Sequence, residues 1–294
     1  MIDRALGLRF SRREHVRGII LMLASTAFFT ANVLIIRELG LVEPVNIWLV
    51  SCARFAVGIG FLAVVYRHEV QFTRVFRRRK LIDRGVIGGL SVALYYVTVV
   101  HLGAGRATFI NNTYIAIGAL LAVWLVREPF RPALAFGGLA SLAGVALLTD
   151  AAAGGFGVNP YDLLGVVTAI GSAYVVVTIR QLHSEGETTA TIFAAQCVHG
   201  LIVCAIPGLL HLQAISWLAG GLMIGAGICA AIGQIAMTAG FRHLPVGEGS
   251  LLQILVPLGI AGGGYLFFGE RFTPHEVVGA ALIVAGIGVT ALRR

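Results

Sequence analysis

Two stretches of the sequence, HLGAGRATFINN (residues 101–112) and HLPVGEGSLLQI (residues 243–254), align without a gap at an offset of 142 residues. The same offset places Glu128 on Glu270, and each glutamate is followed by a phenylalanine, a proline and spaced glycines. Self-similarity at one fixed offset indicates an internal repeat. The chain is therefore predicted to consist of two copies of one structural unit.

Each copy is a series of apolar stretches of about twenty residues, the length that an α-helix needs to cross a bilayer. Of 294 residues, 57% are hydrophobic and 12% are charged, and the mean hydropathy is +0.88. Soluble domains carry about 25% charged residues, so a soluble enzyme is excluded. The predicted spans cover residues 18–36, 46–66, 85–101, 107–126, 132–149, 161–179, 190–210, 214–240, 247–268 and 274–292.

These spans divide into five for residues 1–150 and five for residues 151–294, the two predicted repeats. Because five is odd, the second copy should enter the membrane from the opposite face, related to the first by a pseudo-twofold axis in the membrane plane. Inverted repeats of this kind are typical of secondary transporters, which bind substrate near the midplane between the copies. The predicted fold class is an all-α polytopic membrane protein of ten transmembrane helices in two inverted five-helix repeats.

Basic residues are distributed unevenly over the two membrane faces. Of the 22 Lys and Arg residues, one set of span ends carries only Arg37, Arg106 and Arg271, and Arg54 lies inside a span; the rest lie at the other set of ends. Cytoplasmic loops are enriched in Lys and Arg, so both termini are predicted to be cytoplasmic. The net charge of +8 then reflects topology. We expect a multi-pass inner-membrane protein in contact with lipid and no nucleic-acid partner.

The stretch LLQILVPLGIAGGGYLFFGERFTPHEVVGAALIVAGIGV (residues 251–289) resembles the second signature of EamA-type carriers of the drug/metabolite transporter superfamily. Its marks are the mid-span Pro257, the corner residue Glu270 and a glycine-rich last span. CARFAVG (residues 52–58) resembles the arginine-bearing second span of that family. The resemblance implies ten spans and transport, often export, of small metabolites, and length and aromatic content are most similar to the YddG-type amino-acid exporters. Ile115 stands in the first copy where Pro257 stands in the second, so a symmetric pair of proline kinks is not expected.

Motifs for an enzyme or an energy source are not found in the sequence. The single lysine, Lys80, follows Arg79, so no Gly-x-x-x-x-Gly-Lys phosphate loop exists and ATP hydrolysis is excluded. The acidic residues lie at span ends or in loops, whereas ion-coupled pumps usually place a carboxylate within the membrane. We therefore predict transport without a cofactor, a metal or coupling to an ion gradient, with His199 as the one candidate proton carrier.

Polar side chains inside the spans are the candidates for a substrate site. Amides within lipid must point toward protein or a water-filled cavity. Neutral donors and acceptors with aromatic walls suit a small zwitterionic, partly apolar solute. The predicted substrate-binding residues are Asn32, Tyr95, Asn111, Asn112, Tyr174, Gln234 and Gln253.

Two of these residues are equivalent by the repeat. At offset 142, Asn111 matches Gln253 and Thr108 matches Ser250, and a spacing of three residues puts each pair on one helix face. Pro257 frees the carbonyl of Gln253, four residues earlier. The two amides either flank one midplane substrate site or form hydrogen bonds between helices.

Four residues are predicted to have gating or structural roles: Arg54, Glu128, Pro257 and Glu270. Burying Arg54 within a span costs about 2.5–3.5 kcal/mol or more, so it must bind either a neighbour's backbone carbonyls or a substrate carboxylate. Glu128 and Glu270 occupy equivalent corners, each before a proline that starts the next helix. They either cap helices or form gate salt bridges with Arg131 or Arg271.

The sequence therefore predicts an inner-membrane carrier that exports small metabolites by alternating access, with amino acids that have aromatic or apolar side chains as substrates. Two alternatives are open. A drug or lipophilic-cation exporter would normally have an acidic residue in its pocket. A non-transporting membrane subunit would not need an amide-lined interior in both copies.

Overall fold

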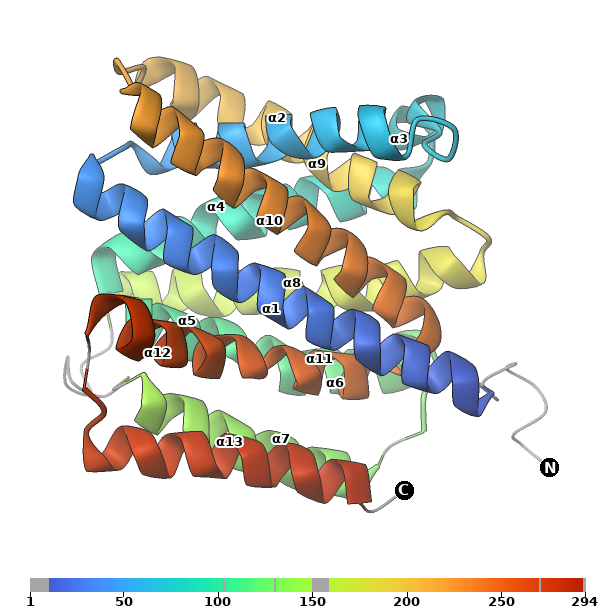
Figure 1. Ribbon diagram of the computed structural model, residues 1–294. Coiled ribbons are helices and arrows are strands. Elements are labelled where there is room, and N and C mark those ends of the chain that lie inside the picture. Colours follow the sequence, from blue (N-terminus) through green and yellow to red (C-terminus); the bar gives the residue numbers. More distant parts are fainter. Residues whose placement is uncertain (1–10, 103, 130, 150–158, 270, 293–294) are drawn as a thin grey trace.

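A computed structural model of the chain describes residues 11–102, 104–129, 131–149, 159–269 and 271–292, arranged as a helical bundle (Figure 1). The helices of the first half of the chain are α1 (Arg12–Val42), α2 (Ile47–Val65), α3 (Phe72–Arg77), α4 (Arg79–Leu102), α5 (Ala104–Asn112), α6 (Tyr114–Leu125) and α7 (Pro132–Leu148). Those of the second half are α8 (Pro160–Ser184), α9 (Thr189–Leu210), α10 (Trp217–His243), α11 (Val246–Gln253), α12 (Leu255–Phe268) and α13 (Pro274–Leu292).

Eight stretches of this fold are long and apolar enough to cross a membrane. They are α1, α2, α4, α8, α9, α10 and two stretches that join short helices, Arg106–Leu125 and Val246–Phe268. The remaining two predicted spans correspond to α7 and α13, which are apolar but shorter. The prediction of an all-helical, multi-pass protein is confirmed for the described residues, and the count of ten spans stays a prediction.

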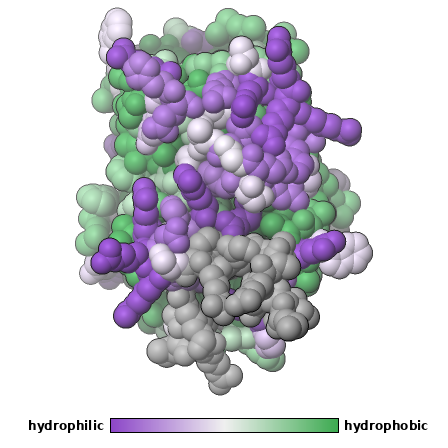
Figure 2. All heavy atoms as spheres, turned by 90° about the vertical axis from the view of Figure 1, so that its right-hand side faces the viewer, coloured by the Kyte–Doolittle hydropathy of each residue, from purple (hydrophilic) through white to green (hydrophobic). Residues whose placement is uncertain are grey.

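Large hydrophobic side chains cover the sides of the bundle. Val64, Trp124, Phe136 and Trp217 each expose 70% or more of their surface. An apolar surface of this extent indicates contact with a membrane. By contrast, Figure 2 shows hydrophilic side chains gathered on the end of the bundle where α1 begins and α2 ends. We call this end the basic end.

The last helices of the two halves, α7 and α13, lie side by side (Figure 1) and make reciprocal contacts. A Cβ atom at Gly144 would lie 2.6 Å from the carbonyl oxygen of Gly279. At the repeat-equivalent positions, a Cβ atom at Gly286 would lie 2.5 Å from the carbonyl oxygen of Gly137. The glycines thus allow close approach of the helices, and the contact looks the same from either helix, as a local twofold axis requires.

The fourth predicted span of each half is broken into two helices. α5 and α6 meet at Thr113, and α11 and α12 meet at Ile254. In the second half, the ring of Pro257 prevents a continuous helix. In the first half, the N–H and Oγ1 of Thr113 both donate to the carbonyl of Ile110, three residues earlier, at 3.1 and 2.7 Å. The halves therefore have equivalent breaks made by different chemistry, and the proline pattern did not predict the break at Thr113.

Candidate functional site

A cavity of about 880 Å³ lies between helices of both halves. This volume is within the range of about 300–1,000 Å³ that is typical of small-molecule sites. Its lining runs from the middle of the bundle to Ile47 at the start of α2, Leu148 at the end of α7 and Phe272 beyond α12. These helix ends lie opposite the basic end. We therefore call that side of the bundle the open end.

Six of the seven predicted substrate-binding residues line this cavity: Asn32, Tyr95, Asn111, Asn112, Gln234 and Gln253. Tyr174, on α8, is not among the described residues that line it. Arg54 and Pro257 also contribute to the wall, whereas Glu270 lies outside the described residues. The structure thus brings residues from distant parts of the chain to one cavity, and their contact with substrate stays a prediction.

The two repeat-equivalent amides have different surroundings. Asn111 is half-buried, and its Oδ1 accepts a hydrogen bond from Oγ of Ser172 at 3.5 Å. Gln253 is 6% exposed, and its Nε2 donates to Oγ of Ser25 (3.2 Å) and contacts Sδ of Met22 (3.4 Å) on α1. Gln253 therefore bonds α1 while it lines the cavity, Asn111 is held more weakly by α8, and substrate contact of either amide stays a prediction.

Three other predicted residues are oriented by bonds within the protein. Nδ2 of Asn32 donates to the carbonyl of Ala226 on α10 at 2.8 Å. Nδ2 of Asn112 donates to the carbonyl of Thr108 at 2.8 Å, and the hydroxyl of Tyr95 lies 2.9 Å from Oγ1 of Thr108. The Asn32 bond holds α1 against α10, the Tyr95 bond holds α4 against α5, and the Asn112 bond lies within α5. The polar walls of the cavity are therefore preorganised.

Two polar groups of the wall keep unused hydrogen-bonding capacity. Arg54, in the middle of α2, donates from Nη1 to the hydroxyl of Tyr96 (3.2 Å), and its Cζ lies 6.0 Å from the ring centre of Phe29. This bond goes to a side chain on α4 and not to a backbone carbonyl. Gln234, on α10, is 4% exposed, and its Nε2 has no hydrogen-bond partner among the described residues. A guanidinium and an amide N–H in one cavity can bind a carboxylate.

Negative charge in the described lining is confined to the open end. Glu276 is the one carboxylate among the described lining residues, and its Oε2 accepts hydrogen bonds from the backbone N–H (2.6 Å) and Oγ1 (2.8 Å) of Thr273. It therefore caps the start of α13. The middle of the cavity carries the positive charge of Arg54 instead. The described residues contain no group of three His, Cys, Asp or Glu side chains that could hold a metal ion.

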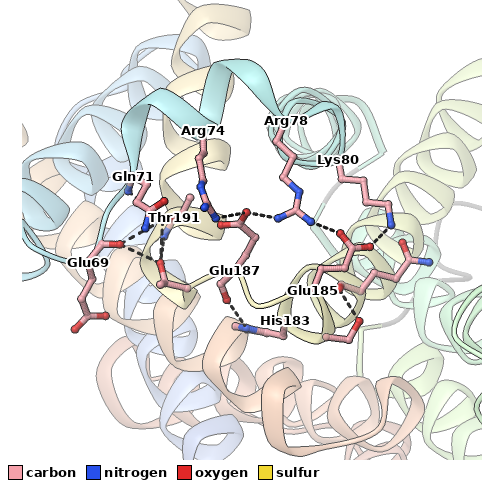
Figure 3. A network of polar contacts seen from close by, with 12 residues as sticks. Glu69, Gln71, Arg74, Arg78, Lys80, His183, Glu185, Glu187 and Thr191 are labelled. Atoms are coloured by element: carbon pink, nitrogen blue, oxygen red, sulfur yellow. Dashed lines mark hydrogen bonds and ion pairs between the residues drawn. The ribbon is translucent and has the colours of Figure 1, made fainter. Parts of the chain in front are cut away.

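The basic end is closed by ion pairs between the two halves of the chain (Figure 3). Nη1 of Arg74, on α3, lies 3.2 Å from Oε1 of Glu187, whose side chain is only 1% exposed. Arg78 bonds both Glu187 and Glu185, and Lys80 bonds Glu185. The glutamates belong to the loop between α8 and α9. We call these five residues the latch.

The latch shifts the pKa of two of its members. Partial burial would raise the pKa of Glu185, but hydrogen bonds and charges from Lys80 and Arg78 outweigh it, so the pKa of this carboxyl is lowered. Partial burial would likewise lower the pKa of Arg78, and the bonds and charges of the glutamates raise it instead. Both shifts favour the charged forms of Glu185 and Arg78.

Glu128 binds across the two halves rather than within its own. Both of its carboxylate oxygens accept the N–H of Val246, the first residue of α11, at 3.1 and 3.0 Å. Nε of Arg180 lies 4.0 Å from Oε1 of Glu128, whereas Arg131, the predicted partner, acts on this carboxylate through its charge and forms no ion pair with it among the described residues. The first N–H groups of a helix need partners, and Pro245 at the N-cap provides no side-chain bond. Burial raises the pKa of Glu128, opposed by the Val246 bond and the charge of Arg180.

His199, the candidate proton carrier, is not among the described residues that line the cavity. Its Nδ1 bonds the carbonyl of Ala195 within α9 at 2.9 Å, and its ring packs against Phe76, with ring centres 5.6 Å apart. Sequence reasoning also missed Arg84. It was assigned to the charges at span ends, but its side chain is fully buried within α4.

The fold and the cavity define a multi-pass membrane transporter. The EamA-like transporter family matches the sequence twice, at residues 16–150 and 159–292. The chain therefore belongs to the EamA-like transporter family, and it is a transporter rather than an enzyme.

Comparison with known proteins identifies relatives with a transport function. The pseudopaline exporter CntI of Pseudomonas aeruginosa, strain UCBPP-PA14, is 24% identical over 217 residues, 69% of this chain and 72% of that protein. The probable transport protein YPL264C of Saccharomyces cerevisiae is 27% identical over 201 residues, 60% of this chain and 56% of that protein. One crystal structure superposes with a TM-score of 0.76 at 21% identity, covering 94% of this chain and 96% of that one, and so has the same fold.

Proposed function

We propose that this protein exports small metabolites with a carboxylate group across the inner membrane, and that amino acids with aromatic or apolar side chains are its substrates. The proposal rests on Arg54, which places a cation in the middle of the cavity. Glu276, the one carboxylate among the described lining residues, lies at the open end. In length and aromatic content the sequence is most similar to the YddG-type amino-acid exporters.

The rest of the cavity wall matches the other parts of an amino acid. Oδ1 of Asn111 has only a long bond to Ser172, so it can accept a hydrogen bond from an ammonium group. Phe29, Tyr96 and Tyr114 also line the cavity and offer aromatic faces to an apolar side chain. A carboxylate on Arg54 would complete recognition of a zwitterion.

The alternative function, export of lipophilic cations, is less well supported. A cation in the middle of the cavity would face the guanidinium of Arg54, and like charges repel in a medium of low dielectric constant. Glu276, the carboxylate of the described lining, already accepts bonds from Thr273 as a helix cap. We therefore assign the protein to carboxylate-bearing substrates.

Transport requires the basic end to open while the open end closes. We propose that the two halves are inverted repeats, residues 1–150 and 151–294, with both termini and the basic end in the cytoplasm. The reciprocal glycine contacts of α7 and α13 and the equivalent breaks of the fourth spans support a twofold relation. With this orientation the cavity faces away from the cytoplasm. Rocking of the halves would then alternate access.

We further propose that this movement is not coupled to a proton or sodium gradient. His199 does not line the cavity within the described residues, and the carboxylate there is a helix cap. In proteoliposomes, an imposed pH or sodium gradient should therefore not drive accumulation beyond the substrate's own equilibrium. Accumulation above that level would contradict this part of the proposal.

A transport assay with three matched solutes tests the substrate class. Purified protein in proteoliposomes should exchange phenylalanine, but not phenylalanine amide or phenethylamine, which lack the carboxylate. Arg54→Gln should reduce the initial rate at low phenylalanine concentration by about tenfold or more, the cost of one charge-assisted hydrogen bond. Arg37→Gln is the matched control, because Arg37 packs over the ring of Phe268 and is not among the described lining residues. Transport of phenethylamine in place of phenylalanine would support the cation alternative.

A further inference from the structure

Arg84 is a buried cation that the proposed binding site does not use. It lies on α4 near the basic end, with 0% of its surface exposed. Its Nη2 donates to Oε1 of Gln196 on α9 at 2.9 Å. Its Nε and Nη1 are also buried and have no hydrogen-bond partner among the described residues. A guanidinium that is removed from water and left with two unused donors calls for an anion.

The guanidinium of Arg84 lies directly behind the wall of the cavity. Gln196 and Gly88, two of its neighbours, both line that cavity. Gly88 is one helical turn after Arg84, and a Cβ atom there would lie only 2.3 Å from Nη1. The missing side chain of Gly88 therefore leaves the space in which the guanidinium sits. Gln196 also lines a small pocket together with Arg54, so one amide adjoins both arginines.

The residues around Arg84 come from both halves of the chain. α4 belongs to the first half and contacts α8 and α9 of the second half. Toward the basic end, Phe76 of α3 packs against His199 of α9, and α3 also carries the latch residue Arg74. A movement of the halves that opens the basic end would separate these contacts and expose Arg84.

We propose that Arg84 is an inner carboxylate-binding site on the substrate pathway, occluded here and exposed when the basic end opens. This proposal rests on the proposed function, because it takes the anion to be the carboxylate of the substrate. The carboxylate binds Arg84 on entry from the basic end, displaces the bond to Gln196, and then passes to Arg54 as the cavity opens on the other side. Arg54 and Arg84 are thus successive partners of one group.

Side-specific kinetics distinguish a binding role from a structural one. In membrane vesicles of both orientations, Arg84→Gln should raise the KM for phenylalanine presented at the basic end by about tenfold or more. The KM at the open end should change less than about twofold. Arg79→Gln is the matched control, an exposed arginine at the start of the same helix. An equal rise in KM at both ends, or no change in KM at either end, would overturn the proposal.

A binding measurement keeps the test independent of the transported solute. Benzoate at millimolar concentration should raise the melting temperature of detergent-solubilised Arg54→Gln protein, whereas the neutral benzamide should not. The effect should disappear in the double variant Arg54→Gln/Arg84→Gln, and Arg54→Gln/Arg84→Lys, which keeps the charge, should retain part of it. Absence of a benzoate effect in Arg54→Gln protein would overturn the inner site. If that effect is present while wild-type protein fails to move phenylalanine, the inner site stands and the proposed substrate is wrong.

Discussion

Corresponding loops meet at the two ends of the bundle, but they meet with different chemistry. At the basic end, the segment between α2 and α4 contacts the α8–α9 loop through the latch. At the open end, the α9–α10 loop contacts the α1–α2 loop. By the repeat, the α9–α10 loop corresponds to the segment between α2 and α4, and the α1–α2 loop corresponds to the α8–α9 loop. There, the N–H of Asn46 donates to Oε1 of Gln213 (3.1 Å), and Nε2 of Gln213 donates to the carbonyl of Pro44 (3.2 Å). The N–H of Ser216 donates to Oε2 of Glu43 at 3.2 Å.

A second pair of contacts repeats at both ends, with the carboxylate on the broken span at one end and on the first helix of the half at the other. At the basic end, Nε2 of His15 on α1 lies 3.0 Å from Oε1 of Glu248 on α11. At the open end, Asp162 on α8 pairs with Arg106 on α5, with Nη2 and Oδ2 2.7 Å apart. Offset 142 makes Arg106 equivalent to Glu248. The first helix of each half therefore contacts the broken span of the other half. The contact uses equivalent positions of the two broken spans, but Arg106 is a cation and Glu248 is an acid.

The comparison shows that the fold specifies where the halves touch, and the side chains specify how strongly. An ionic contact depends on pH, on salt and on each individual charge. The two bonds of Gln213 at the open end are neutral hydrogen bonds and depend on them much less. The latch is therefore the contact by which the closed basic end can be loosened without altering the rest of the bundle.

The largest effect is expected for Glu187→Gln. This change leaves Arg74 and Arg78 without the buried carboxylate that both contact. Because hydrogen bonds to charged groups contribute about 1.5–3 kcal/mol, the free energy of unfolding in detergent should fall by that amount. At the open end, Gln213→Ala should cost only about 0.5–1.5 kcal/mol, typical of neutral hydrogen bonds. Equal losses in denaturant titrations of the two variants would contradict the difference between the ends.

A smaller effect is expected at Glu128, which caps α11 from the first half. Glu128→Ala should reduce the free energy of unfolding by about 1–3 kcal/mol, because the N–H of Val246 is left buried and unsatisfied. Glu128→Gln keeps an acceptor oxygen and should cost less. The same titrations measure both variants. If Glu128→Gln is as destabilising as Glu128→Ala, the charge near Arg180 matters more than the helix cap.

The smallest effect is the pH dependence of the latch. The pKa of Glu185 is lowered in the folded protein, so its contribution is present above the unfolded value of about 4.3. That contribution is lost as the pH falls through the lower, folded value. Glu185 is about one-third exposed, so the effect should be about 0.2–1 kcal/mol. Melting temperatures of wild type and Glu185→Gln should therefore differ at pH 7 and converge only as the pH falls below about 4, whereas the effect of Gln213→Ala should not change over this range.

Sequence reasoning reached the repeat, the positions of the apolar helices and several of the polar residues that line the cavity. Asn111 and Gln253 could be paired because an offset relates them, and an amide inside a span has few places to point except inward. The same reasoning did not predict the break at Thr113. A threonine that bonds the carbonyl three residues earlier leaves no mark as strong as a proline.

What the sequence alone determined follows from local chemistry: apolar length sets the spans, charge bias predicts their orientation, and self-similarity predicts two related halves. What only the tertiary structure decided are the contacts between those halves. Arg84 is one of many arginines near span ends until α8 and α9 bury it, and Glu128 is a corner residue until the start of α11 supplies its donor. The physical reason is that burial and hydrogen-bond partners depend on which surfaces meet, and here these surfaces are more than a hundred residues apart in the chain.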